Sequence, residues 1–153
     1  LITHIVATFW PGVNSNTSSS LSHTQQAATH ELPEAVNSEV RETIYKEFSN
    51  AFNVHDYDSL YDMPSPVAKA QLTREKMVSE FKKLVKYFHS IKSGSFTHSE
   101  LINSQGNTNI YMLYYTVILP DDSEFGNSGT LKVTIVVQGA KYQIYGIRLS
   151  AET

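Results

Sequence analysis

The spacing of hydrophobic residues changes once along the chain, near Gly94. Before this residue apolar side chains recur every three or four positions, which predicts amphipathic helices. After it the period is two, which predicts strands. The predicted helices cover residues 33–52, 57–61 and 74–92, with a short helical turn at residues 67–71. The predicted strands cover residues 95–105, 109–119, 130–138 and 141–150. Helices followed by strands predict an α+β fold with an antiparallel sheet.

Residues that cap or begin helices support these boundaries. Pro33 stands where the first turn of a helix is expected, because proline has no N–H to leave unpaired there. Asp56, Ser65 and Thr73 each precede a predicted helix and can accept a hydrogen bond from its first free N–H groups. These positions predict where the second, short and third helical segments begin.

The strand predicted over residues 109–119 is apolar or aromatic on both alternating faces. A strand with one face in water alternates apolar and polar residues, so both faces of this strand must be covered. We expect the helices to cover one face, either that of Met112, Tyr114 and Thr116 or its alternate. We expect the other face to contact a second subunit, residues 1–10 or another protein.

The first 31 residues differ in composition from the rest. Residues 1–10 are rich in β-branched and aromatic side chains, which is typical of an edge strand that pairs with the main sheet or with a partner chain, or of an arm. Residues 14–30 are a Ser, Thr, Asn and Gln tract that can bury little apolar surface, which predicts a linker. We therefore divide the chain into residues 1–31 and a domain at residues 32–153.

Composition excludes several classes of protein. The chain of 153 residues has a net charge of −3 with scattered basic residues, so it lacks the basic surface expected of a nucleic-acid-binding protein. Cysteine is absent, which rules out disulfides and cysteine chemistry. No run of apolar residues approaches the ~18 that a membrane-spanning helix needs. The chain begins with leucine, which is consistent with the removal of a signal or anchor segment.

Short motifs along the chain point to a family. They are Asp56-Tyr57, Ser65-Pro66, Leu72-Thr73-x-Glu75, Phe81, Ile91-Lys92-Ser93-Gly94 and Tyr142-x-Ile144-x-Gly146-Ile147. With the order of elements, they resemble the nuclear transport factor 2-like (cystatin-like) superfamily, and more narrowly small exported bacterial domains of unknown function. The resemblance covers residues 34–150. It implies three helices packed on a strongly bent four-stranded sheet that forms a cone, a sheet face that often dimerises, and a location in the bacterial periplasm or cell envelope.

Enzymes of this superfamily place acid and base residues in a pocket between the sheet and the helices. Tyr45, Asp62 and Tyr114 are candidates for such a site by residue type, and we assign none of them as catalytic, because the strand at residues 109–119 carries no internal carboxylate or histidine to serve as a base. The pocket that the resemblance implies would be lined by Tyr45, Tyr61, Phe81, Met112 and Tyr114. The interface residues of the sheet would be Tyr111, Leu113, Tyr115 and Val117.

Other charged and polar clusters favour structural roles. The acidic residues at 121–124 lack the ligand spacing of a calcium loop, and we predict no metal site and no cofactor. His98 and Glu100 share one face of a predicted outer strand, where polar residues commonly protect a sheet edge from association. The outer face of the third long helix is expected to be solvated. It carries Lys76, Lys82, Lys83 and Lys86.

These observations favour a non-catalytic exported domain that binds a partner protein or a small apolar ligand through its sheet face or its cone pocket. The expected partner is a second copy of the chain, which would form a homodimer through the sheet, or another protein. Two alternatives stay open. One is an isomerase-like or dehydratase-like enzyme, and the other is an assembly module of a bacterial secretion or conjugation apparatus.

Overall fold

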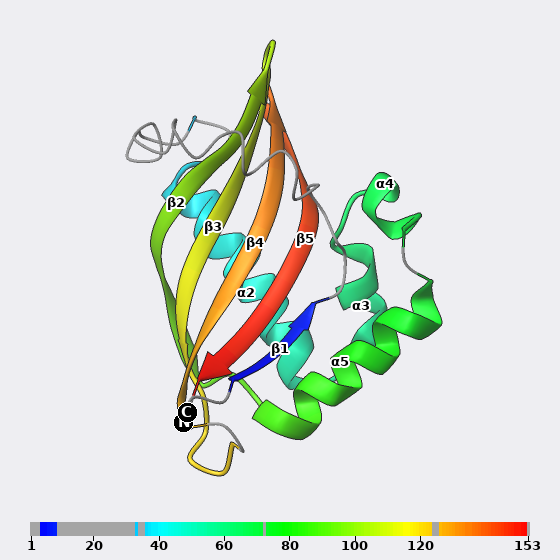
Figure 1. The fold of residues 1–153 in the computed structure, drawn as a ribbon, viewed down its shortest axis with the longest axis vertical. Helices are drawn as coiled ribbons and strands as arrows, with labels where there is room; N and C mark the ends of the chain where they lie inside the picture. The colour runs from blue at the N-terminus through cyan, green and yellow to red at the C-terminus, as the bar shows by residue number, and fades with distance from the viewer. Residues whose placement is uncertain (1–3, 9–32, 34–35, 72, 124–125, 153) are drawn as a thin grey trace.

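A single antiparallel sheet and four helices make up the part of the chain that the computed structural model describes, which is residues 4–8, 33, 36–71, 73–123 and 126–152 (Figure 1). The strand order in the sheet is β1-β5-β4-β3-β2. The strands are β1 (His4–Thr8), β2 (Ser93–Gln105), β3 (Thr108–Ile118), β4 (Ser128–Gln138) and β5 (Lys141–Glu152). The helices are α2 (Ser38–Asn53), α3 (Tyr57–Asp62), α4 (Pro66–Lys69) and α5 (Arg74–Phe88).

The structure confirms the predicted α+β fold and the four antiparallel strands that follow Gly94. It adds a fifth strand, because β1 pairs with β5 from His4 opposite Glu152 to Thr8 opposite Arg148. The apolar segment at the start of the chain therefore contributes a strand to the sheet of its own chain. The predicted linker at residues 14–30 lies outside the described residues.

The helices bury one face each, as their apolar spacing predicts. In α2 the side chain of Asn37 accepts a hydrogen bond from the Val40 N–H at 3.0 Å, and Ile44, Phe48 and Phe52 are buried along one side. In α5 the Thr73 hydroxyl accepts from the Lys76 N–H at 3.1 Å. The buried residues of α5 are Met77, Phe81, Leu84 and Phe88.

The hydrophobic core lies between α2 and one face of the sheet. Figure 1 shows α2 running behind the strands, while α3, α4 and α5 lie beyond β5 and beside β1. Phe48 stacks on Phe52 with ring centroids 5.6 Å apart, and it contacts Phe81 of α5 at 6.1 Å. Aromatic packing therefore joins α2 to α5 and closes the core on the helical side.

The two edge strands of the sheet are β1, which has five residues, and β2. On the β5 side, the Ser65 N–H donates to the Ile144 carbonyl at 2.8 Å, and β1 pairs with the remainder of β5. On the β2 side, the register with β3 shifts at two points, between Phe96 and His98 and between Leu101 and Asn103. Bulges of this kind interrupt the regular ladder that an edge-to-edge partner needs.

Candidate functional site

The two faces of β3 have opposite environments, and the faces are the reverse of those we first predicted. Leu113, Tyr115 and Val117 are each 0% exposed and belong to the core, and Tyr111 packs against the same cluster. These four residues were predicted to form an interface with a partner. The prediction is wrong for Leu113, Tyr115 and Val117, which are buried within this chain, and it stays a prediction for Tyr111, which is only partly buried. Met112 and Tyr114 alternate with them and lie on the outward face of the sheet.

The five residues predicted to line a pocket do not surround one cavity. Tyr45 and Phe81 are buried in the core, and the Tyr45 ring stacks on Tyr115 with centroids 5.9 Å apart. Tyr61 is half-buried on α3. Met112 and Tyr114 lie on the far side of the sheet from Tyr45. Aromatic side chains occupy the space between α2 and β3 where the pocket was expected.

The candidate catalytic residues are also apart. The Asp62 side chain is 71% exposed and forms an ion pair with Lys69, with Oδ1 and Nζ 3.5 Å apart. Tyr45 is in the core and Tyr114 is on the outward sheet face, so the three groups face different surroundings. The structure does not bring the three candidates together, since the sheet itself separates Tyr45 from Tyr114.

Tyr114 is the centre of a compact cluster on the outward face. Its hydroxyl donates to Glu100 Oε1 at 2.6 Å. The His98 ring stacks on the tyrosine ring with centroids 4.2 Å apart and 9° between planes, and Lys132 Nζ lies 5.4 Å from the tyrosine centroid. Histidine and tyrosine are direct partners across β2 and β3, and tyrosine and lysine are direct partners across β3 and β4. The backbone register therefore holds Tyr114 in one orientation.

The cluster keeps the Tyr114 hydroxyl protonated. Burial raises its pKa above the ordinary value of 10.0, and the hydrogen bond to Glu100 and the charge of that carboxylate raise the pKa further. A phenol in this state donates a hydrogen bond and does not act as a base near neutral pH. The arrangement is suited to holding a rigid aromatic surface in place.

The raised tyrosine pKa values predict a loss of stability at alkaline pH. Burial favours the neutral phenol in the folded chain, so this stabilisation is complete below the ordinary pKa of 10.0 and is lost as the pH rises through the folded-state pKa values. We expect the free energy of unfolding, measured with urea, to be constant up to about pH 9 and to fall as the pH rises above about 10. Tyr114→Phe should weaken that dependence, and an unchanged slope in this variant would contradict the role assigned to Tyr114. The affected residues are Tyr45, Tyr111, Tyr114, Tyr115 and Tyr142.

Two rows of side chains cross the outward face beside this cluster. The first row consists of His98, Tyr114, Lys132 and Arg148 on successive strands. The second row, two positions further along β3, consists of Ser95, Thr116, Thr130 and Ser150. We call the two rows together the outward patch. Sequence reasoning identified His98 and Tyr114 but missed Lys132 and Arg148, because polar residues also occupy other outward positions of β4 and β5.

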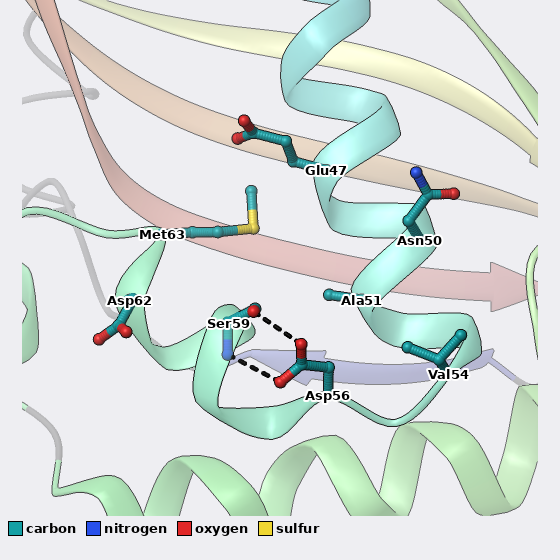
Figure 2. Close-up of a pocket in the computed structure, with 8 residues that line it drawn as sticks. All are labelled: Glu47, Asn50, Ala51, Val54, Asp56, Ser59, Asp62 and Met63. Carbon is teal, nitrogen blue, oxygen red and sulfur yellow. Dashed lines mark hydrogen bonds between the residues drawn. The ribbon is translucent and has the colours of Figure 1, made fainter.

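A cleft with a volume of about 640 Å³ lies between α2 and α3 (Figure 2). Its lining residues are Glu47, Asn50, Ala51, Val54, Asp56, Ser59, Asp62 and Met63. Asp56 caps α3 by accepting from the Ser59 N–H at 3.2 Å and from the Ser59 hydroxyl at 2.7 Å, which lowers the pKa of that aspartate. Within the described ranges, no three side chains are grouped so that they could hold a metal ion.

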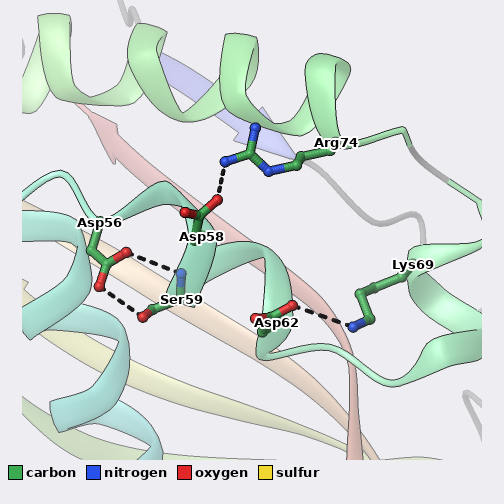
Figure 3. A network of polar contacts seen from close by, with 6 residues as sticks. All are labelled: Asp56, Asp58, Ser59, Asp62, Lys69 and Arg74. Carbon is green, nitrogen blue, oxygen red and sulfur yellow. Dashed lines mark hydrogen bonds and ion pairs between the residues drawn. The ribbon is translucent and has the colours of Figure 1, made fainter.

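Ion pairs connect the helices around this cleft (Figure 3). Asp58 of α3 pairs with Arg74 at the start of α5, and Asp62 pairs with Lys69 of α4. Through these ion pairs the two carboxylates join α3 to α4 and to α5. The pairs are solvent-exposed, so each contributes little to stability on its own. Their arrangement indicates a structural role for this acidic region.

Comparisons of the amino-acid sequence with known proteins identify no relative of this chain. No protein-family model matches the chain, and no curated protein is significantly similar to it in sequence. Among the residues with a described structure, no helix combines the length and the hydrophobicity that crossing a membrane requires. The outward patch is therefore assessed by its own contacts, charges and exposure.

Proposed function

We propose that this protein is a non-catalytic binding domain that docks another protein on the outward face of its sheet. The observation that carries the proposal is the position of Tyr114, which is held by His98, Glu100 and Lys132 and still faces outward. Binding energy in protein interfaces concentrates in a few aromatic and arginine residues that are ordered before the partner arrives. Tyr114 is a residue of this kind, and Arg148 lies in the same row of side chains.

The shape of the patch favours a protein over a small molecule as the ligand. Small-molecule sites are concave and bury most of the ligand. The interior between α2 and β3 is filled by Tyr45, Tyr115 and their neighbours, whereas the outward patch extends across β2, β3, β4 and β5. An extended patch with an aromatic centre and a polar surround is typical of protein–protein interfaces.

The resemblance to the nuclear transport factor 2-like superfamily supplies the cellular context of the proposal. A cone-like domain of that type in the bacterial periplasm or cell envelope would use its sheet face for association, either with a second copy of the chain or with a component of a larger assembly. The α+β order of helices and antiparallel strands supports this assignment. The exported location is itself part of the proposal.

Replacing Tyr114 by alanine is expected to weaken partner binding by about tenfold or more. The wild-type protein, immobilised on beads, captures candidate partners from an extract of its own source, and each candidate is then purified. The dissociation constant for each purified candidate is measured by calorimetry with wild-type protein and with the variant. The loss follows from removal of the aromatic side chain that the cluster holds in place.

Lys86→Ala is the matched control for this experiment. Lys86 is exposed in the last turn of α5, far from the sheet face in the fold. Its substitution should leave the dissociation constant unchanged, and circular dichroism should show that both variants fold. A partner that binds wild-type protein and Tyr114→Ala equally well would refute docking on the outward patch.

A further inference from the structure

Basic side chains are concentrated on helix α5. Five of the twelve lysine and arginine residues of the chain lie within its 15 residues, together with two glutamates. All five basic side chains are exposed, while the apolar side of the helix is buried in the core. The net charge of the whole chain is −3, so α5 is a local excess of positive charge on an acidic protein. Such a surface attracts an anionic ligand.

Part of this basic face forms a groove with a volume of about 520 Å³, which we call the α5 groove. Val78 is partly buried and packs against the hydrophobic core, so it gives the groove an apolar and well-supported floor. The aliphatic stems of lysine side chains can extend that apolar surface while their ammonium groups stay in water. The described lining residues are Arg74, Glu75, Val78, Ser79, Lys82, Lys83 and Lys86.

Two of the lysines in the α5 groove lack a carboxylate partner. The side chains of Lys82 and Lys86 form no ion pair and no hydrogen bond with any residue in the described part of the chain. Lys83 differs from them, because its Nζ lies 3.5 Å from Glu80 Oε2. The groove therefore holds two positive charges that the described part of the protein does not neutralise.

The two unpaired lysines are also placed unfavourably for the helix. Lys82 and Lys86 are four residues apart, which makes them neighbours on one side of α5, and like charges at this spacing destabilise a helix. The carboxylate among the described lining residues, Glu75, is two turns from Lys82, which is about 10 Å along the axis. Salt screens most of the attraction between exposed charges at that separation. An anion bound between the two lysines would relieve their repulsion.

We infer that the α5 groove binds an acidic segment of another protein, with carboxylates paired to Lys82 and Lys86 and an apolar side chain packed on Val78. The α5 groove is separate from the outward patch, because α5 lies beyond β5 and beside β1 (Figure 1). The two surfaces therefore bind different ligands. Lysine ammonium groups each offer three donors, so two of them can hold neighbouring carboxylates without one fixed geometry.

The surroundings of α5 favour a protein over a membrane surface as the anionic ligand. Helices that lie on membranes insert a free apolar face, whereas the apolar face of α5 is already buried in the core. The exposed large apolar side chains in the described part of the chain lie outside α5, and they are Val54, Val67 and Ile118. The net charge of −3 also opposes approach to an extended anionic surface. A short acidic segment places its charges only in the positive groove.

The experiment is a titration of the ¹⁵N-labelled full chain with an octapeptide of glutamates that has one central leucine, at about 0.15 M salt. Amide shifts should saturate and should be largest along α5 at residues 74–86. The same peptide with glutamine in place of each glutamate should not bind. Replacing the leucine by glycine should weaken binding by about threefold, because the apolar contact with Val78 is lost.

Substitutions on α5 separate the groove from the charge of the helix as a whole. Lys82→Gln should weaken binding of the acidic peptide by about threefold, and the double variant with Lys86→Gln by about tenfold. Lys82→Arg should retain binding. Lys76→Gln is the matched control, because Lys76 is exposed on the same helix and is not among the described lining residues of the groove. It should change the dissociation constant by less than about twofold.

Three results would overturn the inference. An equal weakening by Lys82→Gln and Lys76→Gln would show nonspecific attraction to the helix. Amide shifts centred away from α5 would place the acidic ligand on another surface. Co-sedimentation of the wild type with vesicles of phosphatidylserine and phosphatidylcholine, lost in Lys82→Gln and without any binding of the peptide, would make a membrane the ligand.

This inference and the proposed docking function fail separately. Tyr114→Ala should bind the acidic peptide as the wild type does, because it alters only the outward patch. A purified partner that is weakened by Lys86→Ala and is indifferent to Tyr114→Ala would bind through the α5 groove and not through the outward patch. Circular dichroism spectra that match the wild type establish that each variant folds.

Discussion

Tyr115→Ala is expected to lower the free energy of unfolding by about 4 kcal/mol. The side chain is fully buried, its ring packs edge-on against Phe96 at 5.6 Å, and its hydroxyl donates to the Arg41 carbonyl at 2.7 Å. Truncation to alanine would remove these contacts, leave a cavity between α2 and the sheet, and deprive a buried carbonyl of its donor. Urea unfolding followed by circular dichroism measures the change.

Tyr114→Ala is the natural comparison, because the two tyrosines are adjacent in the chain and lie on opposite faces of β3. Its expected cost is about 1 kcal/mol, since the half-buried ring loses its stacking with His98 and the hydrogen bond to Glu100 without opening the core. If Tyr114→Ala lowered the free energy of unfolding as much as Tyr115→Ala does, the outward face of β3 would be buried within the chain like the core face. The outward patch would then have no exposed surface for docking.

Gly129→Ala is expected to cost about 3 kcal/mol, because a methyl group at this position has no room. Its carbon would lie 2.7 Å from the Ser150 carbonyl oxygen, an atom of the neighbouring strand, and 3.3 Å from Val117. The backbone oxygen of a strand that is paired on both sides cannot turn aside as a flexible side chain can. The β4–β5 pairing, which also positions Lys132 opposite Arg148, would have to separate locally.

Ser128→Ala is the control for this substitution, because Ser128 precedes the glycine in β4 and is exposed. Urea unfolding should show no more than a small change for Ser128→Ala and a large one for Gly129→Ala. If Gly129→Ala unfolds at the same urea concentration as the wild type, β4 and β5 do not approach each other as closely at this position as described. The amide shifts of Gly129→Ala along β5 would then match those of the wild type.

Local signals predicted most of the secondary structure. Asp56, Ser65 and Thr73 were expected to begin helices, and each accepts a hydrogen bond from the N–H three residues later. The expected start of the first helix near Pro33 was several residues early, because the cap is Asn37 and α2 begins at Ser38. Capping and periodicity depend on neighbours in the chain, so they can be read without knowing the fold.

The candidate site could be predicted only in part. The alternation in β2 placed His98 and Glu100 on one face, and the structure brings both to Tyr114, from which they are separated in sequence by a turn and most of a strand. Their predicted role in protecting the edge did not include this contact. A pairing between strands depends on register, and the bulges in β2 shift that register by amounts that hydrophobic spacing does not encode.

By itself, the sequence determined the order of helices and strands and the α+β class. That a partner covers the second face of residues 109–119 stays a prediction. Only the tertiary structure decided which face of β3 the helices cover, since both faces are apolar and either could have packed on α2. It also decided that Lys132 and Arg148 stand opposite each other and that β1 completes the sheet beside β5. The physical reason is the same in each case: burial and register are set by contacts between distant segments, and a local pattern cannot choose between equally apolar alternatives.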